Sequence, residues 1–196
     1  MAITINGSGT ITGASTLATT VVSPTLTTPI ATTTIGVGNT TPSASGSGIS
    51  FPATQSASSD ANTLDDYEEG TWTPVITGTS VAGSATYSTQ SGTYVKIGKY
   101  VFLQMFVTFT SAHTGTGGTK VGGFPFTIGA DFGGGGTITY KTAWVTNGPD
   151  FMQTEANTTF GYLRYDTNTA QADIAPNVNI QNTTGFMLSI WYLASA

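Results

Sequence analysis

The sequence predicts an all-β protein in which an extended N-terminal stalk leads into a C-terminal β-sandwich of the jelly-roll type. From residue 71 onward, segments of strand length are separated by Gly, Asn and Asp turn signals, and no segment repeats its apolar residues with the period of a helix. Many short strands at regular spacing are typical of a sandwich or jelly roll. The expected strands lie within residues 71–78, 85–98, 99–110, 119–129, 136–145, 159–167, 173–182 and 184–194.

Alternating side chains support the strand assignment in the two most apolar segments. One face of the segment 99–110 is expected to be core, while the other is half aromatic and half polar, as expected where a sheet packs against another subunit. The first face comprises Val101, Leu103, Met105, Val107 and Phe109, and the second Phe102, Gln104, Phe106, Thr108 and Thr110. In the last strand Phe186, Leu188, Ile190 and Tyr192 oppose Met187, Ser189, Trp191 and Leu193. Both of its faces are largely apolar, so this strand is expected to be central or interfacial.

Residues 1–59 form a separate block, rich in Thr, Ser, Gly and Ala, that carries no charged residue. Its apolar residues are scattered, so a lone copy cannot bury enough surface to offset the entropy of ordering its backbone. Two interpretations follow: a disordered arm, or a thin stalk whose apolar residues are buried between identical chains. Within the block, residues 32–52 are expected to form a short strand, a turn and a second strand, with glycines where the backbone needs an unusual φ.

Composition excludes several classes of function. Charged residues make up only 8% of the 196 residues, and five Lys or Arg residues against ten acidic ones leave a net charge of −5. Nucleic-acid binding needs clustered cations and is not expected. Without cysteine there is neither a disulfide framework nor thiolate chemistry. The N-terminus lacks a signal-peptide pattern and no apolar run reaches the ~18 residues of a membrane span, so we expect synthesis in a cytoplasm and no membrane insertion.

Two motifs stand close together between residues 34 and 110. LDDYEEGTWTP spans residues 64–74, and a strand pair of the form Y-x-K-x-G-x-x-V spans residues 94–101. This segment resembles one shared by many tail-fibre and other virion-surface structural proteins of bacteriophages and prophages. The resemblance implies a homotrimer, a β-rich stalk and a distal globular domain that touches a host receptor. It does not reach residues 111–196 or the first thirty or so, which would specify the receptor and the attachment partner.

Five of the ten acidic residues fall between residues 60 and 69, directly after the uncharged block. The chain therefore divides into an attachment arm and stalk (1–59), an acidic junction (60–70) and a globular β-sandwich domain (71–196). We expect the junction carboxylates to extend into solvent where the stalk widens, while Leu64, Tyr67 and Trp72 pack inward. A cation bound by these oxygens around the trimer axis is the alternative. The junction residues are Leu64, Asp65, Asp66, Tyr67, Glu68, Glu69 and Trp72.

The side chains offer little for catalysis, so no enzyme activity, catalytic residue, metal or cofactor is expected. One histidine, one arginine and no cysteine leave few groups for nucleophilic catalysis or a phosphate site. His113 is expected in a solvent-exposed loop, and the Gly-rich stretch 129–139, which lacks the P-loop pattern, as a long flexible turn. Glycoside hydrolysis would need two carboxylates flanking one bond. The acidic residues of the globular part are Asp131, Asp150, Glu155, Asp166 and Asp173.

Carbohydrate or receptor binding is the remaining kind of site. Aromatic rings stack on the apolar faces of sugars, while Asn, Asp and Thr hydrogen-bond the hydroxyl groups. Segments 143–157 and 162–173 contain both ingredients. Trp144 and Tyr162 have an alternative interpretation as strand residues that face the core. The candidate contact residues for a host receptor or glycan are Trp144, Asn147, Asp150, Phe151, Tyr162, Arg164, Tyr165 and Asp166.

Three functional interpretations follow. The first is a trimeric tail fibre that recognises the host surface through its C-terminal domain and binds other virion proteins through its N-terminal arm. The second is a trimeric capsid decoration protein or head fibre, and the third a small enzyme or secreted lectin outside the virion. An uncharged arm that cannot fold alone favours the first two, because copies of itself or a scaffold would order it. The abundance of the motif in fibres favours the first, with a host glycan or protein as partner and the virion as location.

Overall fold

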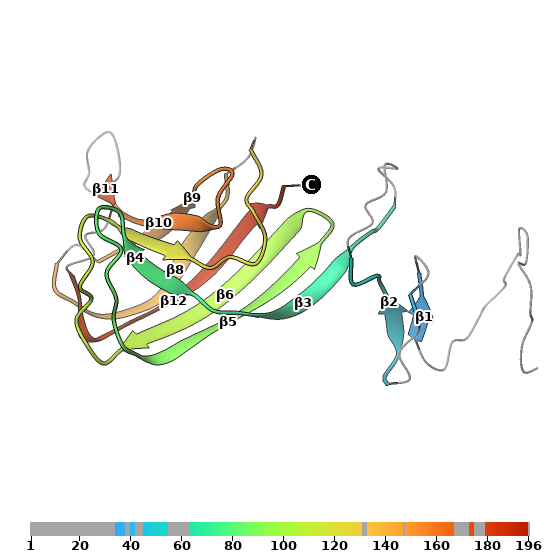
Figure 1. Cartoon of the computed structure of the whole chain (residues 1–196), viewed down its shortest axis with the longest axis horizontal. Coiled ribbons are helices and arrows are strands. Elements are labelled where there is room, and N and C mark those ends of the chain that lie inside the picture. The colour runs from blue at the N-terminus through green and yellow to red at the C-terminus, as the bar shows by residue number, and fades with distance from the viewer. Residues whose placement is uncertain are drawn as a thin grey trace, which may run out of the picture.

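A computed structural model describes residues 34–37, 40–41, 45–54, 63–130, 133–146, 148–166, 173–174 and 179–195. It confirms the all-β prediction (Figure 1). Within these residues no helix is long and apolar enough to cross a membrane. The strands are β1 (Thr34–Gly36), β2 (Gly48–Ser50), β3 (Tyr67–Trp72), β4 (Val75–Gly78), β5 (Tyr87–Ile97), β6 (Tyr100–Phe109), β7 (Thr119–Gly122), β8 (Gly135–Trp144), β9 (Phe151–Thr154), β10 (Phe160–Tyr165), β11 (Asp173–Ile174) and β12 (Ile180–Leu193).

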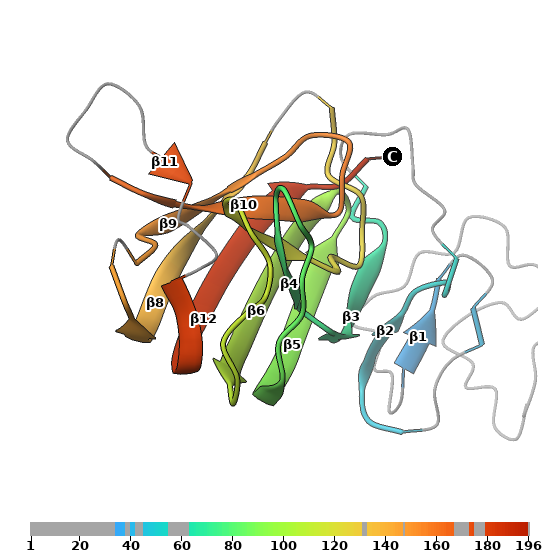
Figure 2. The same ribbon diagram turned by 60° about the vertical axis from the view of Figure 1, so that its left-hand side comes forward.

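One continuous sheet curls over itself to make the two layers of the sandwich. Its strand order is β3-β5-β6-β12-β8-β9-β10-β7-β4, and β11 pairs with β10 outside this path. Figure 2 shows β10 and β4 crossing over the long strands β5, β6 and β12. Only two residues separate β3 from β4, although these strands lie at opposite ends of the hydrogen-bonding order. The sheet is therefore wrapped far enough for its first and last strands to be joined by a short turn.

The centre of the large layer is β12, which pairs antiparallel with β6 on one side and β8 on the other. The alternation expected for these strands is confirmed. Every second residue of β6, from Val101 to Phe109, is at most 4% exposed, and the same holds from Phe186 to Tyr192 in β12. One-sided burial of both strands fixes their register, because a slip of one residue would turn the apolar set outward.

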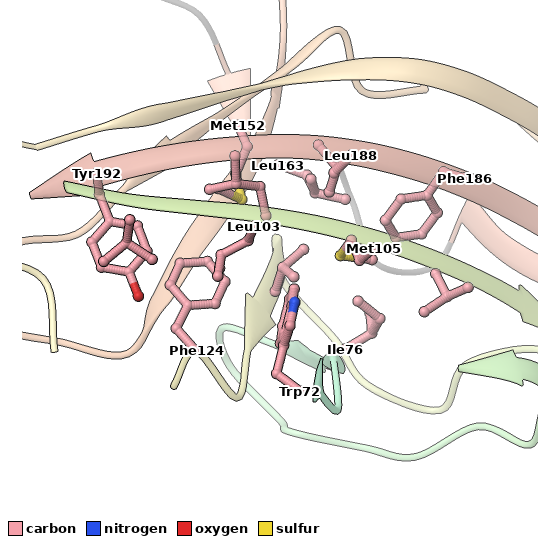
Figure 3. Packing of buried hydrophobic residues seen from close by; sticks show 14 of the residues in the cluster. Trp72, Ile76, Leu103, Met105, Phe124, Met152, Leu163, Phe186, Leu188 and Tyr192 are labelled. Carbon is pink, nitrogen blue, oxygen red and sulfur yellow. The ribbon is translucent and has the colours of Figure 1, made fainter. Parts of the chain in front are cut away.

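Aromatic rings fill the space between the two layers (Figure 3). Trp72 from β3 meets the ring of Phe124 edge to face at 5.5 Å, and Phe124 stacks on Tyr192 at 5.6 Å. The Trp72 indole N–H points to the carbonyl oxygens of Thr93 and Gln104, each 3.2 Å away. Buried side chains of this size each stabilise the fold by about 1.5–3 kcal/mol. The sheet can curl because these rings occupy its interior.

Strands β1 and β2 form a separate two-stranded parallel sheet. The two strands expected in this segment are present, but they pair parallel and not as the hairpin that a single turn would make. Ile35 lies opposite Ile49, and these side chains are 52% and 56% exposed. An isolated two-stranded sheet is marginally stable at best in water, and parallel sheets are normally covered on both faces. Both isoleucine side chains are therefore left uncovered in a sheet that is too small to be stable alone.

Three local expectations differ from the structure. The sheet begins at Tyr67, inside the segment assigned to the acidic junction, and not at residue 71. The Gly-rich stretch expected as a flexible turn contains half of β8. A Cβ on Gly134, just before this strand, would overlap the carbonyl oxygen of Trp191, so glycine there allows close approach to β12.

The third difference is His113, which is buried and not solvent-exposed. Its Nδ1 accepts a hydrogen bond from the Gly115 amide at 2.9 Å, so Nε2 carries the proton and donates to the Ile76 carbonyl at 3.0 Å. The imidazole thus joins the 111–118 connection to β4. A buried polar ring must have partners for its polar atoms, and both ring nitrogens have them here.

Candidate functional site

The acidic junction is held to the large sheet by a buried lysine. The ammonium of Lys96 forms an ion pair with Asp66, and both side chains are only 2% exposed. A second carboxylate, Glu68, lies 3.8 Å from the same nitrogen. The ring of Phe126 covers the ammonium at 5.3 Å, in the geometry of a cation–π contact. The ammonium is thus balanced by acidic groups within the protein.

Backbone geometry explains why Asp66 reaches the lysine. Asp66 adopts φ = 54°, a left-handed conformation that Asp tolerates better than most residues. The Gly98 amide, also at a positive φ, donates to the carbonyls of Asp65 (3.2 Å) and Asp66 (3.0 Å). Directly after Asp66, β3 pairs with β5 so that Glu68 lies opposite Lys96. The junction therefore turns back onto the β5–β6 hairpin.

This arrangement corrects the expectation of solvent-exposed carboxylates at Asp66, whereas Glu69 is exposed as expected and Asp65 and Glu68 are half-buried. Asp66 points inward, whereas Leu64 and Tyr67, expected to pack inward, are 68% and 39% exposed. The inward packing of Trp72 is confirmed. Glu69 accepts a hydrogen bond from the Tyr67 hydroxyl at 2.7 Å, which raises the pKa of that phenol. Among the described residues no three His, Asp or Glu side chains are grouped as metal ligands would be, and Asp60 lies outside them.

The candidate contact residues of the globular domain gather where β8, β9 and β10 meet. Asp150, just before β9, accepts a hydrogen bond from the Asp166 amide at 3.0 Å and pairs with the Lys141 ammonium at 3.0 Å. These two interactions lower the pKa of the Asp150 carboxyl, with the Asp166 amide as the larger cause. Asp150 also donates its own amide to the Arg164 carbonyl at 2.8 Å. Its carboxylate therefore joins two strands to the loop that precedes β9.

The aromatic members of the candidate set divide between core and surface. Trp144 packs against the core, 5.7 Å from the ring of Phe186, which agrees with its alternative interpretation. Its indole N–H is buried without a hydrogen-bond partner in the described structure. Tyr165 also packs against the core, whereas the Arg164 guanidinium lies 5.9 Å from the half-buried ring of Tyr162. Phe151, opposite Arg164 in the β9–β10 pair, is half-buried as well.

A shallow depression of about 210 Å³ adjoins this cluster. It offers an ion pair and the half-exposed ring of Tyr140, a combination suited to hydrogen bonding and stacking. Sequence reasoning included Asp150 but missed Tyr140 and Lys141, because a register shift in the β12–β8 pair decides which β8 residues face outward. Asn147 lies outside the described residues. The lining residues are Ile138, Thr139, Tyr140, Lys141, Pro149 and Asp150.

Comparison with known proteins yields one structural similarity. No protein-family model and no curated protein matches the sequence. The crystal structure of the Dettilon tailspike protein shares the fold with a TM-score of 0.56 and 15% sequence identity, over 66% of this chain. The match covers 24% of the tailspike chain. The β-sandwich architecture therefore recurs in a segment of a phage tailspike, and the present chain spans about a quarter of that protein.

Proposed function

We propose that this chain is a structural protein of a bacteriophage tail, forming a short trimeric fibre or spike component. The observation that carries the proposal is the joint occurrence of the LDDYEEGTWTP element with a tailspike-like β-sandwich. The first is a property of the amino-acid sequence and the second of the backbone geometry. A stalk that leads into a compact β domain on the particle surface would account for both observations.

The N-terminal arm serves in this proposal as the attachment segment to other virion proteins. It has no charge through residue 59, and its described part contains the exposed pair Ile35 and Ile49 in a sheet too small to stand alone. Three copies brought together would cover these side chains without placing like charges near the axis. Homotrimerisation thus supplies the partner surface that β1 and β2 lack.

The C-terminal domain serves as the part that recognises the host surface. Its β8–β9–β10 corner presents the Lys141–Asp150 pair, the half-exposed Tyr140 ring and the depression between them. A glycan or protein receptor would be held by hydrogen bonds to the ion pair and by contact with the ring. This surface includes only part of the contact set inferred from sequence, since Trp144 and Tyr165 pack against the core.

Labelling of particles tests the location. Purified virions would be labelled with a gold-conjugated antibody against residues 111–196 and imaged by electron microscopy. We expect label at the tail. Label distributed over the head would replace the tail fibre by a capsid decoration protein of the same architecture, and particles without label would contradict a virion role altogether.

A further inference from the structure

The large layer of the sandwich has an outer face, which comprises the residues of β3, β5, β6, β12 and β8 that point away from the core. On β6 and β12 the inward set is fully buried, so the alternate residues form this face. Fifteen large hydrophobic side chains are exposed among the described residues, and eight of them lie here. The eight are Tyr67, Val95, Ile97, Tyr100, Phe102, Tyr140, Met187 and Trp191. Exposed apolar side chains that gather in this way mark an interaction surface.

Strand pairing arranges these side chains in apolar layers on either side of a polar one. In the upper layer Phe102 lies between Val95 and Trp191, and Tyr100 stacks on Trp191 with ring centroids 6.5 Å apart. In the lower layer Phe106 lies opposite Met187 and contacts the ring of Tyr140 at 6.3 Å. The five strands span about 19 Å from first to last at ~4.8 Å spacing.

Between the two apolar layers lies a polar row centred on Gln104. Gln104 is paired with Thr93 on β5 and with Ser189 on β12, and the row forms the floor of a depression of about 260 Å³. The three central strands β5, β6 and β12 place no charged side chain on this face, because their single charge, Lys96, is buried inside. The centre of the outer face is thus neutral, and on its β3 edge the face carries Glu69, which lies opposite Val95 and accepts a hydrogen bond from Tyr67.

We infer that the part of the outer face on β3, β5, β6 and β12 packs against the equivalent faces of other copies of this chain, with Gln104 as the layer that sets their register. Tyr140, on the outer strand β8, stays at the rim of this contact beside the depression that adjoins Asp150. The inference rests on the trimer of the proposed function and names the surface on which its copies meet. A symmetric contact brings a surface against itself, so like charges would repel there, and the neutral centre of the face on β5, β6 and β12 avoids that cost. A small neutral ligand would need only the central depression and would leave the apolar layers exposed to water.

The face also continues into the stalk, which favours a second copy over an unrelated partner. The ring of Phe51, just after β2, lies 6.4 Å from that of Tyr67 at the edge of the face. Beyond it, Ile35 and Ile49 are exposed on β1 and β2. Exposed apolar side chains therefore extend from the sheet into the segment that needs companions in order to bury its own surface.

The polar row gives the contact a defined register. A primary amide can both donate and accept, so Gln104 amides from three copies can hydrogen-bond one another around an axis. A shift along the strands would place each amide against an aromatic layer without a partner, which is costly once water is excluded. A single polar layer within an apolar seam fixes register and copy number in coiled coils by the same means.

The test compares purified full-length chains by sedimentation velocity and light scattering. The double variant Phe102→Glu with Trp191→Glu places acidic groups on side chains that are 51% and 46% exposed, so the fold should survive, as circular dichroism would verify. We expect the wild type at three times the chain mass and the double variant at one. Val81→Glu changes an equally exposed side chain, 55%, outside the face and should keep the wild-type mass.

Gln104→Leu tests the register separately. This variant should remain associated but lose its single copy number, giving a mixture of species where the wild type gives one. A monomeric wild type, or a double variant that keeps the trimer mass, would overturn the inference. It would also be overturned if the double variant kept the wild-type mass but lost the retention that the wild type shows on an immobilised neutral polysaccharide. A single trimeric species for Gln104→Leu would overturn the role of Gln104. These masses are measured on purified chains, whereas the labelling is measured on virions. The inferred contact can therefore be wrong while the tail location is right, and the reverse.

Discussion

A lysine withdrawn from water must find its charge partner and hydrogen-bond acceptors inside the protein. Lys96 finds them in Asp66 and Glu68, and the ring of Phe126 closes the remaining side. The pair joins the segment before β3 to β5, so it ties the acidic junction to the large sheet. Removing one member leaves the other charge buried without its partner, which is the costly way to disturb an ion pair.

Asp66→Asn should therefore destabilise the domain by about 3–5 kcal/mol. Asparagine also tolerates the left-handed backbone of Asp66, so the change isolates the charge from the φ of 54°. Urea denaturation followed by tryptophan fluorescence measures the difference. Glu155→Gln removes an exposed carboxylate as the matched control and should stay within about 0.5 kcal/mol. Equal small effects for both variants would contradict the buried pair.

The surface carboxylate of Asp150 predicts that the stability of the domain depends on pH. Its pKa lies below the ordinary 3.8, because the Asp166 amide and the Lys141 ammonium stabilise the carboxylate. A depressed folded pKa contributes stability above the unfolded pKa and loses it as pH falls through the folded value. Asp150→Asn should lower the melting temperature slightly at neutral pH, by well under about 1 kcal/mol in stability since the side chain is 48% exposed.

The difference in melting temperature between wild type and Asp150→Asn should shrink in acid, once the wild-type carboxyl is protonated. Calorimetry from about pH 7 down to about pH 2 follows this convergence. A difference that stays constant over the whole range would show that the amide substitution acts through packing and not through charge.

At the scale of elements, two glycines decide how closely the strands approach. A Cβ on Gly92 of β5 would overlap the Trp72 indole, whose N–H points to carbonyls of β5 and β6. Gly134 plays the same part where the chain enters β8 beside β12. Both positions lie against neighbours that cannot move without disturbing the core, so a side chain at either would shift a strand.

Gly92→Ala should destabilise the domain by about 1–3 kcal/mol through this overlap. Gly122→Ala is the matched control, since it also changes a strand glycine but its Cβ would find its nearest neighbour at an ordinary 3.5 Å. Thermal unfolding with near-ultraviolet circular dichroism reports both stability and the environment of Trp72. Equal melting temperatures for the two variants would mean that the indole moves aside freely.

At the scale of the whole molecule, the chain combines a self-contained core with surfaces that are not covered. Every residue of the hydrophobic core cluster lies between Trp72 and Ala194. The exposed apolar residues gather on the outer face of the large layer and on β1 and β2. The globular part therefore has a core of its own, whereas the described N-terminal strands leave Ile35 and Ile49 exposed, which the proposed homotrimer would cover.

Deleting residues 1–62 should leave a folded β domain with a lower melting temperature than the full chain. The core remains intact, but the deletion removes the apolar residues that the proposed homotrimer would bury between copies. Calorimetry of both proteins at equal molar concentration measures the difference, with circular dichroism to verify the fold. Equal melting temperatures, together with the same number of chains per assembly in both proteins, would contradict an intertwined stalk.

The sequence by itself determined the β class, the core-facing residues of β6 and β12, and the point where the uncharged N-terminal block ends. It could do so because alternation and charge are local properties of the chain. Only the tertiary structure decided the fate of Asp66, His113 and Trp144, since their burial depends on partners 30, 37 and 42 residues away in Lys96, Ile76 and Phe186. For the same reason the sequence did not reveal the apolar outer face of the large layer. Its layers form only when distant strands pair in one register, and no local pattern specifies which distant strands meet.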